Sequence, residues 1–245
     1  MIKVTISCTF YARIGIGFNM CGLVGFCDQH KLMDQRILVR MRDSLAHRGP
    51  DSKGLYFDVG EYCALGLGHQ RLSVLDLSDN GNQPMSFEHL ELCYNGEVYN
   101  YKEIRLELIE KNYNFFSDSD TEVILKAFHC WGVQAIERFN GMFAFSLYDK
   151  KNKKLYLVRD RVGIKPLYWG NIGKAFAFAS EIRSFKEIPK IELSINRDAL
   201  TSLLKYNYIP SPISIYENIF KLNPVSILTI DSRGNKETKK ILGYL

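Results

Sequence analysis

Cys21 directly follows a methionine, Met20. If translation starts at Met20 and that methionine is removed, Cys21 carries a free α-amino group, whose ordinary pKa is about 7.7–8.0. Such an amine can accept the proton of the thiol on the same residue, directly or through one water, and so forms a nucleophile–base pair within one residue. The thiolate would attack a carboxamide carbon, release ammonia and leave a thioester that water hydrolyses. The alternative interpretation is a buried structural cysteine.

A carboxamide substrate with an amino-acid head group makes three further demands. Its α-carboxylate requires a guanidinium group and its α-ammonium group requires an anion, while the oxyanion of the intermediate requires neutral N–H donors. The candidates are Arg71, the run Asn95-Gly96-Glu97 after an apolar segment, and Asp120. Each also has a purely structural interpretation: a surface ion pair for Arg71, a hairpin turn for Asn95-Gly96, and a helix cap for Asp120.

The elements that must position these residues follow from hydrophobic periodicity. Residues 22–27 form a short apolar run that predicts a core strand directly after Cys21, and 31–46 predict a helix that ends at a glycine and a proline. A second helix is expected over 99–111, and a third begins near Ser119, because Ser119 and Glu122 are spaced as a capping box. Further elements are expected as strands over 62–69, 90–94, 143–148, 155–159, 167–169, 175–179 and 226–230, and as a short helix over 196–206.

Strands in hairpins together with a few long helices indicate an α+β fold with helices layered on antiparallel sheets. The strands over 143–148 and 155–159 flank a polar turn and predict a β-hairpin. We interpret the aromatic run 143–148 as a core strand and not as a cofactor site.

The composition narrows the class of protein. A chain of 245 residues with 46% hydrophobic residues can bury a substantial core. A net charge of +5, without a basic stripe, makes nucleic acid an unexpected partner. The six cysteines show no metal-binding spacing, so we expect no metal site and reduced thiols, hence a cytoplasmic location. The sequence has no apolar run of the ~18 or more residues that span a bilayer.

The chain resembles the glutaminase domain of glutamine-dependent asparagine synthetases, which are class II amidotransferases of the N-terminal-nucleophile hydrolase fold. The matching motifs are collinear over residues 20–181, and weaker similarity continues to about residue 230. They are CGLVGFC at 21–27, HRGPDS at 47–52, HQRLSVLDL at 69–77, QP at 83–84, YNGEVYNY at 94–101, SDSDTEVILK at 117–126, NGMFAFSLYDK at 140–150, VRDRVGIKPLYWG at 158–170 and ASE at 179–181.

The resemblance implies a four-layer αββα fold, with two antiparallel sheets stacked between helices, and L-glutamine as the substrate. It implies Cys21 as the nucleophile, with its α-amine as base, and an oxyanion hole made by the Asn95 side chain and the Gly96 N–H. It assigns mainly structural or interface roles to Arg48, Asp51 and residues 159–161. The substrate-binding residues that it implies are Arg71, Leu72, Ser73, Val74, Leu75, Asn95, Gly96, Glu97 and Asp120.

The resemblance also divides the chain. Residues 1–20 are expected to be an extension, from a start codon assigned too early or from a propeptide, and the amidotransferase domain is expected over 21–232. Residues 233–245 are interpreted as a truncated linker toward an ATP-pyrophosphatase domain, whose Ser-Gly-Gly-x-Asp-Ser loop does not occur in the sequence. ATP and Mg²⁺ are therefore expected only for that other domain, and no cofactor for this chain. A separate synthetase partner and a homodimer are both open.

Three alternatives stay open at this point. The ammonia could serve another carboxylate acceptor, such as a sugar acid. The domain could be catalytically silent and kept for binding or regulation. Lastly, an unrelated cysteine hydrolase would need a histidine near Cys21, from among His30, His47, His69, His89 and His129.

Overall fold

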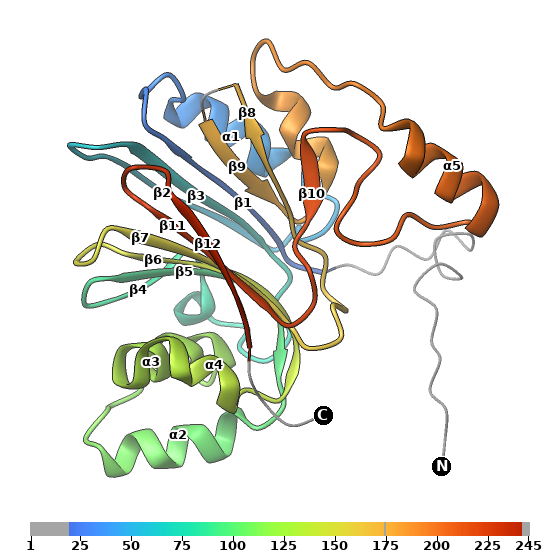
Figure 1. Ribbon diagram of the computed structural model, residues 1–245. Helices are drawn as coiled ribbons and strands as arrows, with labels where there is room; N and C mark the ends of the chain where they lie inside the picture. The colour runs from blue at the N-terminus through green and yellow to red at the C-terminus, as the bar shows by residue number, and fades with distance from the viewer. Residues whose placement is uncertain (1–19, 174, 242–245) are drawn as a thin grey trace, which may run out of the picture.

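Two antiparallel sheets, stacked face to face, form the centre of the computed structural model, which describes residues 20–173 and 175–241 (Figure 1). Within these residues each sheet has six strands. Sheet 1 has the order β10-β8-β9-β1-β3-β2 and sheet 2 the order β12-β11-β7-β6-β5-β4. The strands of sheet 1 are β1 (Gly22–Asp28), β2 (Ser52–Val59), β3 (Ala64–Arg71), β8 (Tyr168–Ile172), β9 (Ala175–Ala179) and β10 (Ile219–Lys221). Those of sheet 2 are β4 (Met85–Phe87), β5 (Leu90–Val98), β6 (Gly141–Asp149), β7 (Lys154–Arg159), β11 (Ser226–Asp231) and β12 (Lys236–Lys240).

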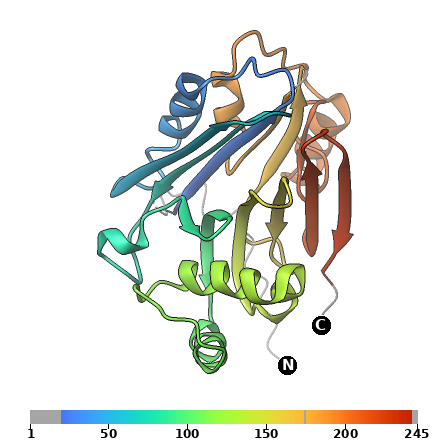
Figure 2. The same ribbon diagram turned by 90° about the vertical axis from the view of Figure 1, so that its left-hand side faces the viewer.

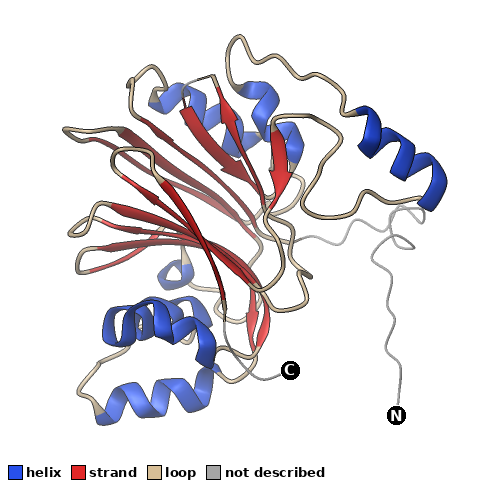
Figure 3. Ribbon diagram, in the orientation of Figure 1, coloured by secondary structure: helices blue, strands red, loops and turns tan. Residues whose placement is uncertain are grey.

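Helices cover the two outer faces of this sandwich (Figures 1 and 3). Helix α1 (Gln35–Asp43) and the 3₁₀ helix η4 (Ile182–Glu187) pack on sheet 1, and α2 (Tyr101–Glu110), α3 (Asp120–Trp131) and α4 (Ala135–Arg138) lie on the outer side of sheet 2. Two more 3₁₀ turns are η2 (Asp79–Gly81) and η3 (Gly132–Gln134). Helix α5 (Arg197–Tyr206) lies to one side of the sandwich and buries only Ala199.

Apolar side chains fill three separate layers between these elements. Figure 2 shows the sheets and helices from the side. One layer packs Leu38 and Met41 of α1 against sheet 1, and another packs Val123 and Ile124 of α3 against sheet 2. The middle layer lies between the sheets and includes Phe178. Each sheet is apolar on both faces, and both faces are buried in a four-layer αββα arrangement. This confirms the fold that the family resemblance implied.

The predicted hairpin is confirmed, and several element boundaries move. Helix α1 begins at Gln35 and not at 31, because the Asp28 carboxylate accepts the N–H groups of His30, Leu32 and Met33 and holds these residues in a turn. The Asp34 side chain then caps the helix by accepting the Ile37 N–H at 3.0 Å. The strand expected over 62–69 begins at Ala64 and ends at Arg71.

The expected capping box at α3 is only half present. The Ser119 side chain accepts the Thr121 N–H, as a cap should. Glu122, however, does not reach back to Ser119: it accepts the N–H and O–H groups of Ser117 at 2.8 and 2.6 Å and pairs with Lys126 at 2.5 Å. Glu122 therefore holds the loop before the helix through Ser117 and does not complete the capping box with Ser119.

Four strands were not predicted from the sequence: β2, β4, β10 and β12. Strand β12 lies in the segment 233–245 that we expected to be a linker, and it pairs with β11 from Ile230↔Lys236 to Ser226↔Lys240. All five of its residues are exposed, so backbone pairing and not apolar burial forms this strand. The expected extension 1–20 lies outside the described residues except for Met20. No helix in the described part of the chain is long and apolar enough to cross a membrane.

Candidate active site

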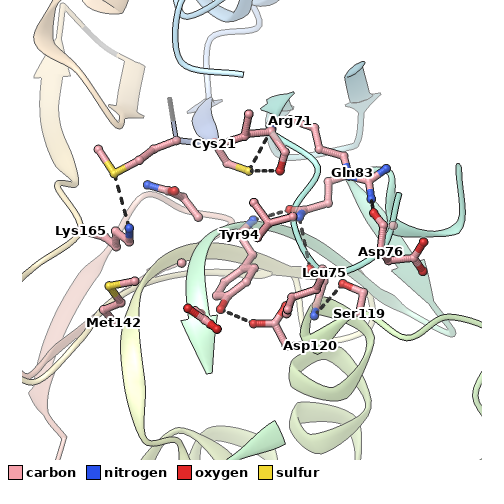
Figure 4. A pocket seen from close by; sticks show the side chains of 18 residues that line it. Cys21, Arg71, Leu75, Asp76, Gln83, Tyr94, Ser119, Asp120, Met142 and Lys165 are labelled. Atoms are coloured by element: carbon pink, nitrogen blue, oxygen red, sulfur yellow. Dashed lines mark hydrogen bonds between the residues drawn. The ribbon is translucent and has the colours of Figure 1, made fainter. Parts of the chain in front are cut away.

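A cavity of about 220 Å³ opens where the start of β1, the end of β3, strand β5 and the start of α3 converge (Figure 4). Of the ten residues predicted for the site, nine line this cavity, although they are up to 99 residues apart in the chain, from Cys21 to Asp120. They are Cys21, Arg71, Leu72, Val74, Leu75, Asn95, Gly96, Glu97 and Asp120. Ser73 is not among the lining residues; its N–H donates to Asp51 Oδ2 at 2.8 Å.

The Cys21 thiol lies against the chain that follows β3. Leu72 N–H donates to Cys21 Sγ at 3.3 Å, and Sγ lies 3.5 Å from the Leu72 carbonyl oxygen. Burial raises the pKa of the Cys21 thiol, and the Leu72 N–H opposes this increase. Arg48 Nε donates to the Cys21 carbonyl at 3.1 Å and so fixes its backbone. The thiol thus needs a nearby base to ionise near neutral pH.

Asn95 presents an unpaired amide to the cavity. The side chain is buried, and its Nδ2 has no hydrogen-bond acceptor among the described residues. A buried N–H donor without an acceptor costs about 1–3 kcal/mol. The Asn95 amide is therefore suited to receive an oxygen of a bound molecule.

Gly96 lets β5 approach β6 closely beside this amide. Gly96 pairs with Phe143 in the ladder, and its φ is +155°. A Cβ at Gly96 would collide with the backbone of Met142 and Phe143. The site therefore requires a glycine here for packing.

Arg71 is anchored with part of its guanidinium group unused. Its Nη1 donates to the Ser78 carbonyl at 2.8 Å and to Asn82 Oδ1 at 2.9 Å, and its Nη2 donates to the Asp76 carbonyl. A guanidinium has five N–H groups, so two of them, on Nε and Nη2, have no partner among the described residues. A planar donor pair of this kind matches a carboxylate.

The opposite wall of the cavity carries two carboxylates, Glu97 and Asp120. Asp120 Oδ2 accepts the hydroxyl of Tyr94 at 2.6 Å and the N–H of Val98 at 3.0 Å. Burial raises the pKa of Asp120, and these two bonds oppose the increase. A bound cation would stabilise the ionised form of this buried carboxylate.

Three further lining residues were not singled out from the sequence, although each lies inside a matching motif. Tyr94 is buried and orients Asp120. Gln83 accepts the Tyr94 N–H at 2.6 Å and donates to Thr121 at 3.3 Å, which joins β5 to α3. Lys165 lines the cavity from the segment after β7. Their positions inside the motifs were the only available signal.

The histidines do not form a dyad with Cys21. All five are described, and none lines the cavity. His69 is fully buried and its Nε2 lies 2.9 Å from the Tyr94 carbonyl, and burial lowers its pKa to about 4. The described residues also contain no cluster of three or more His, Cys, Asp or Glu side chains that could hold a metal ion.

Stacked antiparallel sheets between helices, with a cysteine before the first strand at the cavity, define an N-terminal-nucleophile hydrolase fold. The chain belongs to the glutamine amidotransferase domain family, whose model matches residues 20–241. It is therefore a glutamine amidotransferase of class II, with glutamine as the substrate of the family.

Curated relatives support this assignment. The chain is 39% identical over 222 residues to asparagine synthetase (glutamine-hydrolysing) 1 of Bacillus subtilis, covering 88% of this chain and 34% of that protein. It is 34% identical over 222 residues to asparagine synthetase (glutamine-hydrolysing) 3 of the same organism, covering 88% and 35%. The chain thus spans less than half the length of the curated relatives it matches.

The fold has solved counterparts. The glutamine phosphoribosylpyrophosphate amidotransferase of B. subtilis, in complex with ADP and GMP, superposes with a TM-score of 0.68 at 18% identity. The match covers 91% of this chain and 49% of that one. At this identity the likeness shows the fold alone.

Proposed function

We propose that Cys21 hydrolyses glutamine to glutamate and ammonia through a thioester. The observation that carries this proposal is that the Cys21 thiol and the unpaired amide of Asn95 line one cavity. The first can supply a nucleophile, and the second can receive the oxyanion that forms when a carboxamide is attacked.

The remaining walls of the cavity select glutamine among amides. The two N–H groups of Arg71 left without a described partner take the α-carboxylate, and Glu97 and Asp120 take the α-ammonium group. The chain 72–75 closes the side of the cavity next to Arg71. The substrate is thereby held at its amino-acid end, and its carboxamide is directed toward Cys21.

The base is the α-amino group of Cys21 itself. In the described chain this nitrogen is bonded to Met20, and an amide nitrogen cannot act as a base. The active form therefore begins at Cys21, after loss of everything before it. The free amine takes the thiol proton, gives it to the departing ammonia, and then activates the water that hydrolyses the thioester.

The ammonia supplies an ATP-dependent synthetase that amidates aspartate. In support, the curated relatives are named glutamine-hydrolysing asparagine synthetases. ATP and Mg²⁺ belong to that second reaction, and the chemistry at Cys21 needs no cofactor. A sugar acid or another carboxylate is the alternative acceptor. The acceptor can be identified by testing which carboxylate restores coupled ATP consumption with a synthetase partner.

The test of the proposal is ammonia release from glutamine by protein that begins at Cys21, with Cys21→Ala as the paired variant. We expect release only from the cysteine form, and a glutamyl adduct on the peptide that carries Cys21 after acid quench. Cys130→Ala is the matched control, because this half-buried cysteine lies outside the cavity. If protein that begins at Cys21 released no more ammonia than its Cys21→Ala variant, the proposal would be wrong. The alternative of a catalytically silent binding domain would then be favoured.

A further inference from the structure

A tightly bonded loop follows β7 and leads into the active-site cavity. The Asp160 carboxylate is fully buried and accepts five backbone N–H groups. Oδ1 binds three consecutive N–H groups, those of residues 162–164, at 2.6–3.1 Å. Oδ2 binds the N–H of Lys165 at 3.1 Å and that of Phe143, in β6, at 3.2 Å. The loop backbone therefore has one defined conformation, attached to sheet 2.

Arg159 holds the same loop from the other side. Its guanidinium donates to the carbonyl oxygens of Lys165 at 2.8 Å, of Gly163 at 2.6 Å and of Leu222 at 2.6 Å. Gly163 has φ +72°, and a Cβ there would meet Pro224 and the Arg159 guanidinium. Two buried charged side chains thus fix the backbone on both sides of the residue that ends the loop, Lys165.

The side chain of Lys165 lines the same cavity as Cys21 (Figure 4). It is buried, and Nζ donates to Met20 Sδ at 3.4 Å. Met20 is the residue bonded to the Cys21 nitrogen, and Met20, Cys21 and Lys165 line the same cavity. Among the described residues, no carboxylate forms an ion pair with Lys165.

The charges around this position come from several elements. Arg48, after α1, and Arg71, at the end of β3, are positive; Glu97 of β5, Asp120 of α3 and Asp160 of the loop are negative. Burial lowers the pKa of Lys165, Arg48 lowers it further, and the Cys21 thiolate raises it. Both arginines are anchored: each donates to backbone carbonyl oxygens, and Arg48 also pairs with Glu181. Lys165 is thus the described cation at the cavity that has only a thioether as its partner.

We propose that Lys165 is a positioning residue of the glutaminase site, whose ammonium group keeps the free α-amine of Cys21 neutral and the attacking thiolate stable. The inference rests on the function proposed above. A positive charge nearby disfavours protonation of the amine, so the base is available at lower pH. The same positive charge stabilises the Cys21 thiolate. It thereby opposes the effect of burial, which disfavours ionisation of the thiol. Removal of Met20 frees Nζ from its thioether partner and exposes it to both groups.

The experiment measures kcat/KM for glutamine against pH in protein that begins at Cys21, for wild type, Lys165→Met and Lys165→Arg. Protein that begins at Cys21 retains every helix and strand of the structure, because the first strand begins at Gly22. We expect Lys165→Met to raise the pH of half-maximal kcat/KM by about one and to lower activity at pH 7 by about tenfold. Lys165→Arg keeps the charge and should restore most of the wild-type profile. Lys205→Met, an exposed lysine on α5, is the control for loss of one charge and should leave the profile unchanged.

A second readout needs no turnover and also serves if Lys165→Met folds poorly. The rate at which iodoacetamide alkylates Cys21, followed by mass spectrometry of its peptide in Lys165→Gln, should show the same rise in the midpoint pH. A Lys165→Met or Lys165→Gln profile that overlays wild type would overturn the proposal, as would a change in KM alone. Failure of the proposed function is distinguishable, because wild type would then release no more ammonia than Cys21→Ala.

Discussion

At the scale of single residues, the polar groups of this protein fall into two kinds. Glu122 is buried, yet its carboxylate is fully used by Ser117, Phe116 and Lys126. Asn95 Nδ2, also buried, has no acceptor among the described residues. An unpaired buried donor is costly, and at the cavity a bound molecule can supply the missing acceptor. Asn95 thus both lines the cavity and has a buried side-chain donor that is unpaired among the described residues.

Asn95 therefore provides the first prediction. Asn95→Ala should lower kcat about 10²- to 10³-fold with little change in KM, because the oxyanion exists only after the thiolate has attacked. Steady-state kinetics of ammonia release measure both constants. Asn218→Ala, at an exposed site, should behave as wild type. A raised KM with unchanged kcat would instead make Asn95 a ground-state binding residue.

Asp120 combines a binding role with a cost in stability. Asp120→Asn keeps an oxygen for the bonds from Tyr94 and Val98 but removes the negative charge, so KM should rise about 10- to 100-fold. Folding raises the pKa of Asp120 above its ordinary value of 3.8, so its ionisation at neutral pH opposes folding. The variant should thus have a higher Tm than wild type at pH 7.

This difference in Tm should vanish below about pH 4, where Asp120 of wild type is protonated in both the folded and the unfolded chain. In wild type, KM should begin to rise on acidification at a higher pH than an ordinary aspartate would give. Thermal unfolding measured from about pH 3 to 8, and KM over the range in which the protein stays folded, check both statements. A variant that is less stable at pH 7 and unchanged at pH 4 would contradict the sign.

At the scale of elements, the close approach of β5 and β6 creates the site. Gly96 pairs with Phe143, and Asn95 pairs with Ala144. Each strand therefore has a small residue, Gly96 or Ala144, at this part of the ladder. Asp160 then connects β6 to the loop of Lys165 through the Phe143 N–H. The proposed oxyanion donors and the loop of the buried lysine are therefore connected through strand β6.

Gly96→Ala tests this ladder. Its Cβ would overlap the backbone of β6, so the strands must separate at a cost of about 1–3 kcal/mol, which lowers Tm by several degrees. Activity should also be lost in the fraction that stays folded. Gly60→Ala is the matched control, since a Cβ there meets nothing closer than 3.7 Å and Tm should stay within about 1 °C. Equal Tm for both variants would show that β6 can yield at Gly96.

At the scale of the whole molecule, two sheets bring together residues that lie far apart in the chain. Arg71 ends strand β3 of sheet 1, and Cys21 directly precedes strand β1 of the same sheet. Residues 95–97 belong to β5 of sheet 2. The cavity lies where these two sheets and α3 meet, so it exists only when all of them are packed. The proposed reaction further requires that the α-amine of Cys21 is free.

The state of the N-terminus gives the last prediction. Protein that retains residues 1–20 should release ammonia at least about 100-fold more slowly than protein that begins at Cys21, because its base is an amide. Intact-mass analysis of each sample, beside the ammonia assay, establishes which form is active. Full activity in protein whose mass still includes residues 1–20 would contradict the role of the amine.

Much of this site could be read from residue types and order. The motif around Asn95 and Gly96, the helix start at Ser119 and the hairpin over 143–159 are local patterns, so short stretches of sequence carry them. Lys165 could not be recognised in the same way, because its environment comes from Asp160, Arg159 and Met20 together. Strand β12 was missed because exposed polar residues form it through backbone pairing alone.

The sequence by itself determined the α+β class, the cysteine that follows a methionine, and the residue types that an amino-acid amide requires. Only the tertiary structure decided which polar groups remain unpaired and what surrounds each charge. The physical reason is that a hydrogen-bond partner or a neighbouring charge can come from any distance along the chain. Cys21 and Leu72 are neighbours because β1 pairs with β3 within sheet 1. Met20 and Lys165 are neighbours because the loop after β7 of sheet 2 lies against the start of β1.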